Sequence, residues 1–564
     1  MEKISKTVKN PFVLAIALNL IPLLVYLAFG SGKFDSLDDY FMSSVLTGAY
    51  GSEYDVHLYF VNVIFGYALK PFYLLFPTVG WYYIFEIGAA FVSFSAITYV
   101  LLKRCGYGGG LVLSSLILTT VAPEFYFGMN FTQCAEILTA AGTLLLVVGS
   151  FERIKLWACV GSLMMIWGYM MRENAFLLAM PFVVVMIVFY VIKKKYVPKE
   201  LLVAGICCCF AVWSVNKIDK GAYETPEYKA YATFQDPRAT LGDVRYYDFD
   251  AAYSDLEERG FSGNDLRAAR NWMFYDTDVF SVSGIQPMLQ AINHNRYELD
   301  TWKTIASVIL KFSKSLWSTN AWCWVLLGLL LTLHLRGKFR LLPWISLCLI
   351  ALCLGYLFYV NRVVHHVEVG IWLYGTVMLL PFVEKYVFDG FFFSRRALIG
   401  LGVFLTTLFS CAVFFTSDVQ NQVKSVGLDQ RKKELQKIVL YANEHLDDAF
   451  LFPFELYKSL GACRNEISFR AVEPGSWQNI FPLGYWNVYL PGMNRELEKR
   501  GVNNPLKDLI KNGVYYVQER GALIFGPQSV WEEHYGFELS ADTIQRFGNF
   551  DVLKFYVKRD GYEK

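Results

Sequence analysis

The strongest constraint on this chain is a series of apolar runs, each close to the length that crosses a bilayer. A transmembrane helix needs roughly 20 mostly apolar residues. With 55% hydrophobic and 18% charged residues, the 564-residue chain is too apolar for a water-soluble protein of its size. We therefore predict a polytopic α-helical membrane protein with about 11 transmembrane helices in a cell membrane. The runs lie near residues 11–29, 80–102, 111–127, 134–151, 156–171, 175–192, 201–218, 320–335, 341–360, 369–386 and 397–416.

Basic residues alternate between the connections. Cytoplasmic loops of membrane proteins collect Lys and Arg. If the N-terminal Lys3, Lys6 and Lys9 are inside, every second connection is basic. This pattern predicts a cytoplasmic N-terminus and an extracytoplasmic C-terminus. The basic connections are 103–104, 153–155, 193–199, 336–340 and 385–396.

One apolar segment does not fit this alternation. Residues 58–76 are interrupted by Asn62, Lys70 and Pro71, and counting them as a span would reverse the orientation of every later segment. We expect one or two helices there that lie at the outer interface or re-enter the membrane. Residues 30–79 then form the first outer loop.

Two further regions are predicted to face water outside the cytoplasm. The large outer loop, 219–319, carries fifteen acids against eight Lys and Arg over residues 219–300, with turn signals at Asp236-Pro237 and Ser262-Gly263-Asn264. Its last part, 301–318, has the apolar spacing of an interfacial helix. Residues 1–416 thus form a transmembrane module and residues 417–564 a small extracytoplasmic α/β domain. In that domain we predict helices at 429–445 and 505–511 and strands at 449–453, 514–518 and 552–557.

Carboxylates directly follow the first span. Like charges this close raise one another's pKa, which suits a general base working near neutral pH. They could equally hold a divalent cation. The alternative is a set of solvated loop acids in which Asp38 or Asp39 caps a helix from Tyr40 to Leu46. The cluster comprises Asp35, Asp38 and Asp39, followed by Glu53, Asp55 and His57.

The acidic first outer loop, the juxtamembrane helices, the many spans and the C-terminal outer domain together resemble the GT-C superfamily of membrane glycosyltransferases. The segments "DDYFMSSVLTGAYG", "DVH" and "GWYYIFE" resemble bacterial members with surface-polysaccharide functions. The resemblance implies a polyprenyl-phosphate sugar donor and a glycan or lipid-linked acceptor at the outer face. It also implies a general base in the first loop, which falls on Asp38, with Asp39 or Asp35 as alternates. A second acid in the next outer loop would correspond to Glu124, which could instead be an ordinary helix-end carboxylate.

Cations are predicted at the same membrane surface. Arg172 lies in the tight turn between the fifth and sixth spans, where an ionisable residue near lipid suggests a function. It could instead simply pair with Glu173. Arg362, His365 and His366 follow the ninth span and suit contact with a phosphate. We include His57 among the substrate-binding candidates, and His294 with Arg296 as weaker ones. The two adjacent histidines could bind a metal, but no spaced third ligand is apparent.

Other functional classes lack their signatures. The sequence contains no Walker-type loop, dinucleotide fingerprint, HExxH or CxxC motif. Its net charge of +2 gives no reason to expect a nucleic-acid partner. We predict an inverting glycosyltransferase that acts at the outer face. One rival is a polysaccharide polymerase or ligase with a pyrophosphate-linked donor, which would depend on Arg362 or His294. Another is a lipid-linked glycan transporter or flippase, which would place its charges midway through the spans.

Overall fold

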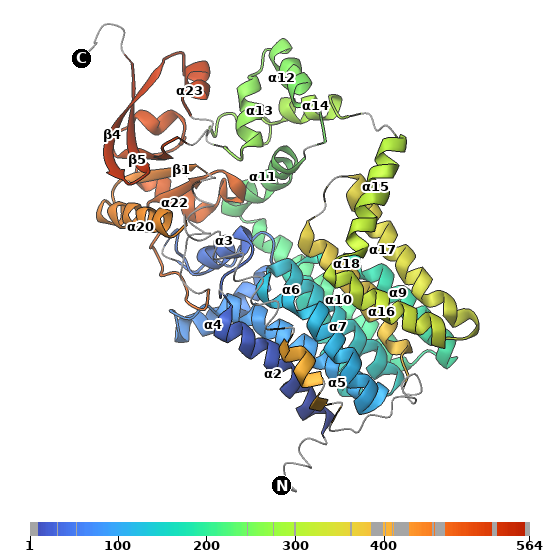
Figure 1. Cartoon of the computed structure of the whole chain (residues 1–564). Coiled ribbons are helices and arrows are strands. Elements are labelled where there is room, and N and C mark those ends of the chain that lie inside the picture. Colours follow the sequence, from blue (N-terminus) through green and yellow to red (C-terminus); the bar gives the residue numbers. More distant parts are fainter. Residues whose placement is uncertain are drawn as a thin grey trace.

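The structure is a computed structural model in which a helical bundle carries two smaller lobes at one end (Figure 1). It describes residues 10–558 except 31, 52, 245, 275, 298–300, 361, 363, 385–396, 398, 401, 409, 411–427, 454–455, 457–467 and 522–526. The predicted span at 397–416 lies only partly within these residues. The basic connection at 385–396 lies outside them.

Six helical segments of the described chain are long and apolar enough to cross a membrane. A seventh is present if α15 (Thr301–Leu316) and α16 (Thr319–His334), bent by 81°, count as one span. The count of about eleven therefore stays a prediction. Three predicted runs form helices too short to meet the same length test: α8 (Lys155–Met171), α16 and α18 (His365–Leu379). The six are α2 (Pro11–Phe29), α5 (Trp81–Thr120), α7 (Phe131–Phe151), α9 (Glu173–Lys194), α10 (Lys199–Tyr223) and the segment Gly337–Tyr359 that contains α17 (Leu342–Tyr359).

Helix α5 joins two predicted runs into 40 residues. At Gly106 the backbone has a φ of 69° and leaves the helical region, so the chain bends there between the two runs. Glycine adopts this conformation without the steric cost that a Cβ would impose. The two runs are thus connected by a kink without an intervening loop.

Helix α7 is the centre of the bundle, because every one of its residues is buried. Helix α8 packs closely against it where Gly142 faces Gly161. A Cβ on Gly161 would lie 2.5 Å from the carbonyl oxygen of Gly142, so small residues permit this approach. At the periphery, α10 exposes a row of large apolar side chains. Their contact with lipid in a bilayer would be favourable, whereas their contact with water would not. They include Leu202, Val203, Ile206, Phe210 and Trp213.

The segment that broke the alternation of charge forms a single short helix, α4 (Val63–Leu75). Its 13 residues span about 20 Å, which is shorter than the hydrocarbon core of a bilayer. Leu74, Leu75 and Phe76 at its end are 72%, 71% and 57% exposed. This agrees with the predicted helix at the membrane interface.

The large outer loop forms a helical lobe. Ser262 is the N-cap of α13 (Gly263–Arg270), so the turn signal at Ser262-Gly263-Asn264 marks the start of a helix. The turn predicted at Asp236-Pro237 is wrong, because both residues lie inside α11 (Pro226–Asp243). Since a proline lacks only its own N–H, the helix continues with one hydrogen bond missing. The lobe also contains α12 (Phe249–Glu258) and α14 (Gln286–His294).

The C-terminal region is the predicted small α/β domain. Its five strands have the order β2-β1-β3-β5-β4, with β1 parallel to β2 and β3, and with β5 antiparallel to β3 and β4. The three predicted strands and the long helix are confirmed, whereas β2 and β4 were not predicted. A short 3-10 helix, Lys507–Ile510, stands where a helix at 505–511 was expected. The elements are α20 (Leu428–Glu444), β1 (Ala449–Pro453), β2 (Ile480–Leu483), α22 (Pro491–Lys499), β3 (Val514–Glu519), α23 (Pro527–Tyr535), β4 (Leu539–Phe547) and β5 (Phe550–Val557).

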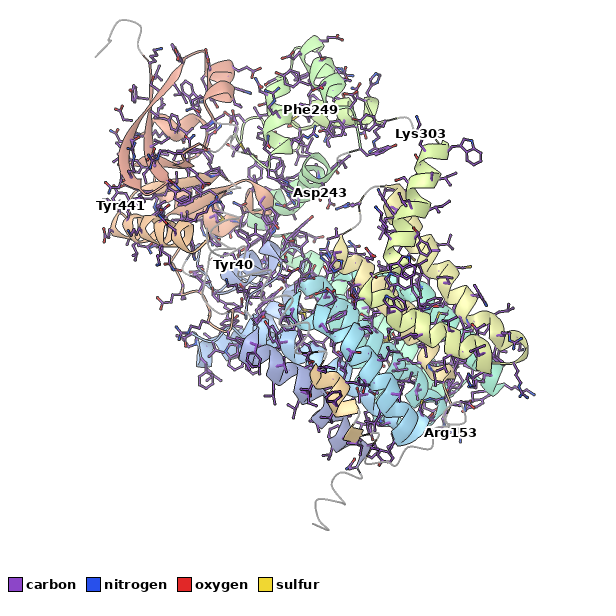
Figure 2. All side chains as sticks on the ribbon, in the orientation of Figure 1. Tyr40, Arg153, Asp243, Phe249, Lys303 and Tyr441 are labelled. Carbon is purple, nitrogen blue, oxygen red and sulfur yellow. The ribbon has the colours of Figure 1, made fainter. Side chains whose placement is uncertain are left out.

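This domain rests directly on the first outer loop. The backbone N–H groups of Gly475 and Trp477 donate to the carbonyls of Gly48 and Ala49 at 2.9 and 2.8 Å. Figure 2 places Tyr40 between the bundle and the C-terminal domain, and Arg153 at the opposite end of the bundle. The predicted outer loop and a predicted cytoplasmic connection thus lie at opposite ends of the bundle.

Candidate functional site

The acidic cluster begins helix α3 (Leu37–Leu46). The Ser36 hydroxyl accepts from the backbone N–H groups of Asp38 and Asp39 at 3.0 and 3.4 Å, which makes Ser36 the N-cap. Both aspartates occupy the first turn, where the helix dipole favours negative charge. The alternative in which one of them caps a helix starting at Tyr40 is therefore wrong. Successive residues of a helix point about 100° apart, so the two carboxyls face different surroundings.

Asp39 faces inward and is fully buried. Its carboxyl accepts from the Tyr82 hydroxyl at 2.8 Å and from the Phe131 N–H at 3.1 Å, which ties α3 to α5 and α7. Burial raises the pKa of Asp39, and the neighbouring Asp38 and Glu86 interact with it electrostatically. This environment suits a structural carboxyl, because solvent and substrate have no access to it.

Asp38 faces outward and is half-buried beneath the C-terminal domain. Its Oδ1 atom accepts from the Tyr485 hydroxyl and, at 2.9 Å, from the Trp486 indole N–H, both in the 3-10 helix Tyr485–Asn487. Burial raises the pKa of Asp38, while these two hydrogen bonds and the charges of Arg172 and Arg238 oppose the rise. Oδ2 accepts no hydrogen bond from the residues that the structure describes, so it is left to receive a proton.

Arg172 lies in the turn between α8 and α9, half-buried over two aromatic faces. Its guanidinium carbon is 4.8 Å from the ring centre of Phe60 and 5.1 Å from that of Phe131. The alternative pairing with Glu173 does not occur, since Arg172 makes no ion pair in the described part of the chain. Its charge instead interacts with that of Asp38, and burial lowers its pKa.

Arg238, on α11, is a cation that the sequence analysis missed. It is 2% exposed, lies over the Trp272 ring at 5.3 Å and donates from Nε to Gln235 at 2.9 Å. Its Nη1 atom is buried without a hydrogen-bond partner among the described residues. A buried guanidinium nitrogen without an acceptor is costly, unless a ligand supplies the acceptor. The excess of acids in its loop and the turn expected at Asp236-Pro237 gave no indication of a buried cation at this position.

The remaining cations form an outer edge of the same cluster. Arg362 is 67% exposed and pairs with Asp243 of α11 at 3.1 Å. His365, at the start of α18, contacts Glu124 of the short helix α6 (Ala122–Phe127) at 3.1 Å. The hydrogen bond with Glu124 raises the pKa of His365.

The edge and the centre of this cluster are electrostatically connected. Burial and the charge of Arg172 lower the pKa of His366 to about 4, so it is neutral at pH 7. Arg362 interacts with Arg172, and the exposed Asp35 interacts with His365 and Glu124. Apart from the weaker candidates His294 and Arg296, eight of the nine site residues expected from the sequence therefore belong to one connected cluster. They are Asp35, Asp38, Asp39, Glu124, Arg172, Arg362, His365 and His366.

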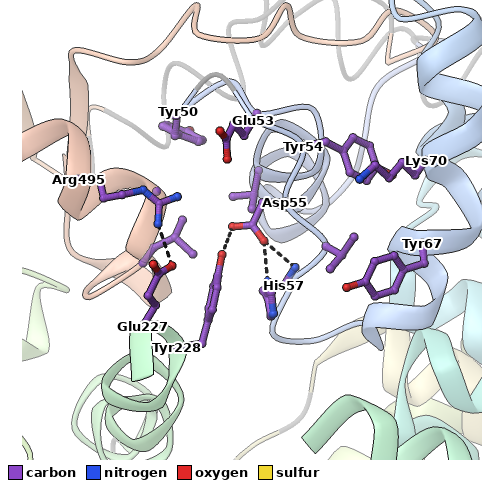
Figure 3. Close-up of a pocket in the computed structure, with 16 residues that line it drawn as sticks. Tyr50, Glu53, Tyr54, Asp55, His57, Tyr67, Lys70, Glu227, Tyr228 and Arg495 are labelled. Atoms are coloured by element: carbon purple, nitrogen blue, oxygen red, sulfur yellow. Dashed lines mark hydrogen bonds and ion pairs between the residues drawn. The ribbon is translucent and has the colours of Figure 1, made fainter. Parts of the chain in front are cut away.

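His57 is the exception. Its Nδ1 atom bonds to Asp55 at 2.8 Å, and its ring stacks on Tyr228 with 3.6 Å between centres. Both lie in a separate cavity of about 500 Å³ (Figure 3). His294, on which the rival polymerase would depend, is exposed at the end of α14.

The described residues offer no ligand set for the divalent cation that the sequence allowed. No three His, Cys, Asp or Glu side chains among them lie close enough together to hold a metal ion. The donors on Asp38 Oδ1 are a phenol and an indole, which a metal would have to displace. Arginines are the cations that face this carboxylate.

Tyr485 and Trp486 also escaped the sequence analysis. They follow Gly484 between β2 and α22, and Tyr485 adopts a φ of 67°, which is uncommon for a residue with a side chain. An aromatic pair after a glycine is a weak signal by itself. Only the packing of the C-terminal domain brings position 485 to position 38.

Comparisons with known proteins found little. No protein-family model matches the chain, and no curated protein matches it. Among solved structures, the crystal structure of ArnT from Cupriavidus metallidurans bound to undecaprenyl phosphate matches with a TM-score of 0.36 and 11% identity, over 96% of this chain and 97% of that chain. A likeness this distant does not say which lipid, sugar or acceptor this chain handles.

Proposed function

We propose that this protein is a GT-C-like glycosyltransferase of a bacterial cytoplasmic membrane that moves a sugar from a polyprenyl-phosphate donor to a surface glycan or lipid-linked acceptor. The observation that carries the proposal is a half-buried carboxylate, Asp38, that faces the half-buried Arg172 and the buried Arg238 at one end of an apolar helical bundle. One side chain can remove a proton while the cations bind phosphate. Both requirements of sugar transfer from a lipid phosphate are present at one place.

The reaction is a single displacement. Oδ2 of Asp38 accepts the proton of the acceptor hydroxyl, whose oxygen forms a bond to the anomeric carbon of the sugar. The bond from that carbon to the phosphate oxygen breaks, and its electron pair leaves on the polyprenyl phosphate. Because attack and departure are on opposite faces of the sugar, the anomeric configuration inverts.

Each nearby group has a task in this scheme. Tyr485 and Trp486 hold Oδ1 of Asp38, so the other oxygen keeps one orientation. The raised pKa of Asp38 makes it a better proton acceptor than an ordinary aspartate. Arg172 and the unpartnered Nη1 of Arg238 stabilise the charge that develops on the departing phosphate.

The test is transfer of radiolabelled sugar in membranes that contain equal amounts of each variant. Asp38→Asn keeps the shape of the side chain and removes the base, so the rate should fall by about 10²–10⁴-fold. Glu258→Gln removes an exposed carboxylate on α12 and should leave the rate unchanged. A wild-type rate in Asp38→Asn would refute the proposal.

The rival polymerase or ligase is tested in the same assay. Arg362 is largely exposed and already paired with Asp243, so Arg362→Ala should cost less than Asp38→Asn. Loss of activity in Arg362→Ala, with Asp38→Asn fully active, would favour the rival. The flippase is separated from both because it would move lipid-linked glycan without forming a new glycosidic bond.

A further inference from the structure

The cavity that contains His57 lies outside the cluster around Asp38. It has a volume of about 500 Å³, within the usual range of small-ligand sites. Three regions that are far apart in the sequence line it: the first outer loop with its helix α4, the start of α11, and the start of α22 in the C-terminal domain. Figure 3 shows side chains from each of them turned toward a common space.

A carboxylate is held in place at the centre of this cavity. Oδ1 of Asp55 accepts from the His57 backbone N–H at 3.0 Å and contacts His57 Nδ1 at 2.8 Å, and Oδ2 accepts from the Tyr228 hydroxyl at 2.6 Å. A carboxylate has about four lone-pair positions, so Asp55 keeps capacity for a further donor. Glu53 stands next to it without an ion pair among the described residues.

Tyrosine rings surround these carboxylates. Tyr67 of α4 is 54% exposed and points into the space (Figure 3). Tyr54 donates its hydroxyl to the Gly66 carbonyl at 2.8 Å, which fixes its ring in the wall. Aromatic faces beside fixed carboxylates match a ligand with apolar C–H faces and many hydroxyl donors.

The charges in the cavity argue against an anion. Three carboxylates line it against one lysine and one arginine, Lys70 and Arg495, and the His57 ring already contacts Asp55. Arg495 is already paired with Glu227 at 2.9 Å. A phosphate would meet more repulsion than attraction, whereas a neutral polyhydroxyl ligand would not.

The cavity lies close to Asp38, which indicates how a ligand bound in the cavity could take part in the reaction. Val45, near the end of α3, and Gly48, just after it, line the cavity, and Asp38 is in the first turn of the same helix. Seven residues of helix separate Asp38 from Val45, which is about 10 Å. A bound chain that fills the cavity could therefore place its end at the base.

From these observations we infer that the cavity is a saccharide-binding site for a neutral glycan, whose sugar rings stack on Tyr67 and donate hydroxyl hydrogens to Asp55 and Glu53. Its role as the site that holds the acceptor glycan rests on the proposed transferase function. The binding of saccharide itself does not. The two can thus be tested separately.

The binding test uses the purified full chain in detergent and saturation-transfer NMR with methyl glycosides of glucose, galactose, mannose, rhamnose and N-acetylglucosamine. At least one glycoside should receive saturation, and Asp55→Asn should weaken its binding by about 10-fold or more. Tyr67→Ala changes an exposed ring and should fold normally while weakening binding by up to about 10-fold. Tyr67→Phe should retain it, and the control Tyr356→Ala, on lipid-facing α17, should have no effect.

Three results would overturn the inference: no saturation of any glycoside, equal saturation in Asp55→Asn and Tyr67→Ala, or displacement of the glycoside by inorganic phosphate. The Asp38→Asn protein separates the two proposals, because it should bind the glycoside normally without transferring sugar. Glycoside binding without any transfer by the wild type would leave the saccharide site standing and refute the transferase. Transfer without glycoside binding would refute the saccharide site alone.

Discussion

The two sides of helix α3 place neighbouring aspartates in opposite environments. On the outer side, Asp38 faces Arg172 and Arg238 and is covered by the C-terminal domain. On the inner side, Asp39 faces Tyr82 and Glu86 and is sealed from solvent. The residue type is the same, so the surroundings decide which carboxyl can do chemistry and which can only hold the fold.

The largest effect that would sharpen this contrast is expected at Arg238. Arg238→Gln removes a buried charge proposed to stabilise the departing phosphate, so kcat/KM should fall by about 10²–10³-fold. The exposed Arg267 of α13 provides the matched control, and Arg267→Gln should keep the wild-type value. A fully active Arg238→Gln variant would contradict the proposal that cations on the outer side of α3 stabilise the departing phosphate.

The inner side should respond in stability. Asp39→Ala leaves the Tyr82 hydroxyl and the Phe131 N–H without their acceptor, which should cost about 1–3 kcal/mol of unfolding free energy. Thermal unfolding of the purified protein in detergent would measure it. Asp39→Asn keeps an acceptor oxygen and should cost less. Full stability together with abolished transfer in Asp39→Ala would exchange the roles assigned to the two aspartates.

The pH profile tests the charge that Arg172 places beside the base. The charge of Arg172 lowers the pKa of Asp38, so Arg172→Gln should raise that pKa and move the acid limb of kcat/KM upward by up to about one pH unit. Below the limb Asp38 is protonated and cannot accept a proton, so activity falls as pH falls. Arg172→Lys keeps the charge and should leave the limb where it is. A downward shift in Arg172→Gln would contradict the assignment.

The smallest effect is expected at the edge of the cluster. Glu124 and His365 form a largely exposed pair, and such pairs contribute little, so Glu124→Gln should lower transfer by less than about 5-fold. Replacing the carboxylate by a neutral amide weakens the hydrogen bond and removes the charge, so the pKa of His365 should fall, and rates at pH 5.5 and pH 8 should be compared. His365→Gln should give the same result. A loss of two orders of magnitude in Glu124→Gln would instead place this carboxylate in the chemistry, as the GT-C resemblance implies.

Local signals in the sequence were sufficient for much of the fold. Helices α2 and α7 follow the runs at 11–29 and 134–151, because apolar length is a local property. The strands β1, β3 and β5 follow short runs rich in aromatic and β-branched residues. The residues that interrupt the apolar run at 58–76 anticipated a helix too short to span, and α4 has 13 residues.

The failures have equally specific causes. Asp236-Pro237 has the composition of a turn, yet the surrounding residues continue as α11, so Arg238 was placed in a loop when it is in fact in a helix. The position of the break at Gly106, between the runs at 80–102 and 111–127, depends on one glycine conformation that the apolar pattern does not show. Tyr485 and Trp486 lie about 450 positions from Asp38, and nothing local to either segment shows that they meet.

The sequence by itself determined that the chain needs a bilayer, that its acids follow the first span, and that a small α/β domain ends it. These properties depend on apolar length and on spacing along the chain. The tertiary structure decided that Asp38 is the accessible carboxyl and Asp39 the buried one, that Arg238 joins the cluster, and that His57 belongs to a different cavity. Burial, pKa and the set of nearby cations are properties of space, and they exist only once distant segments have packed together.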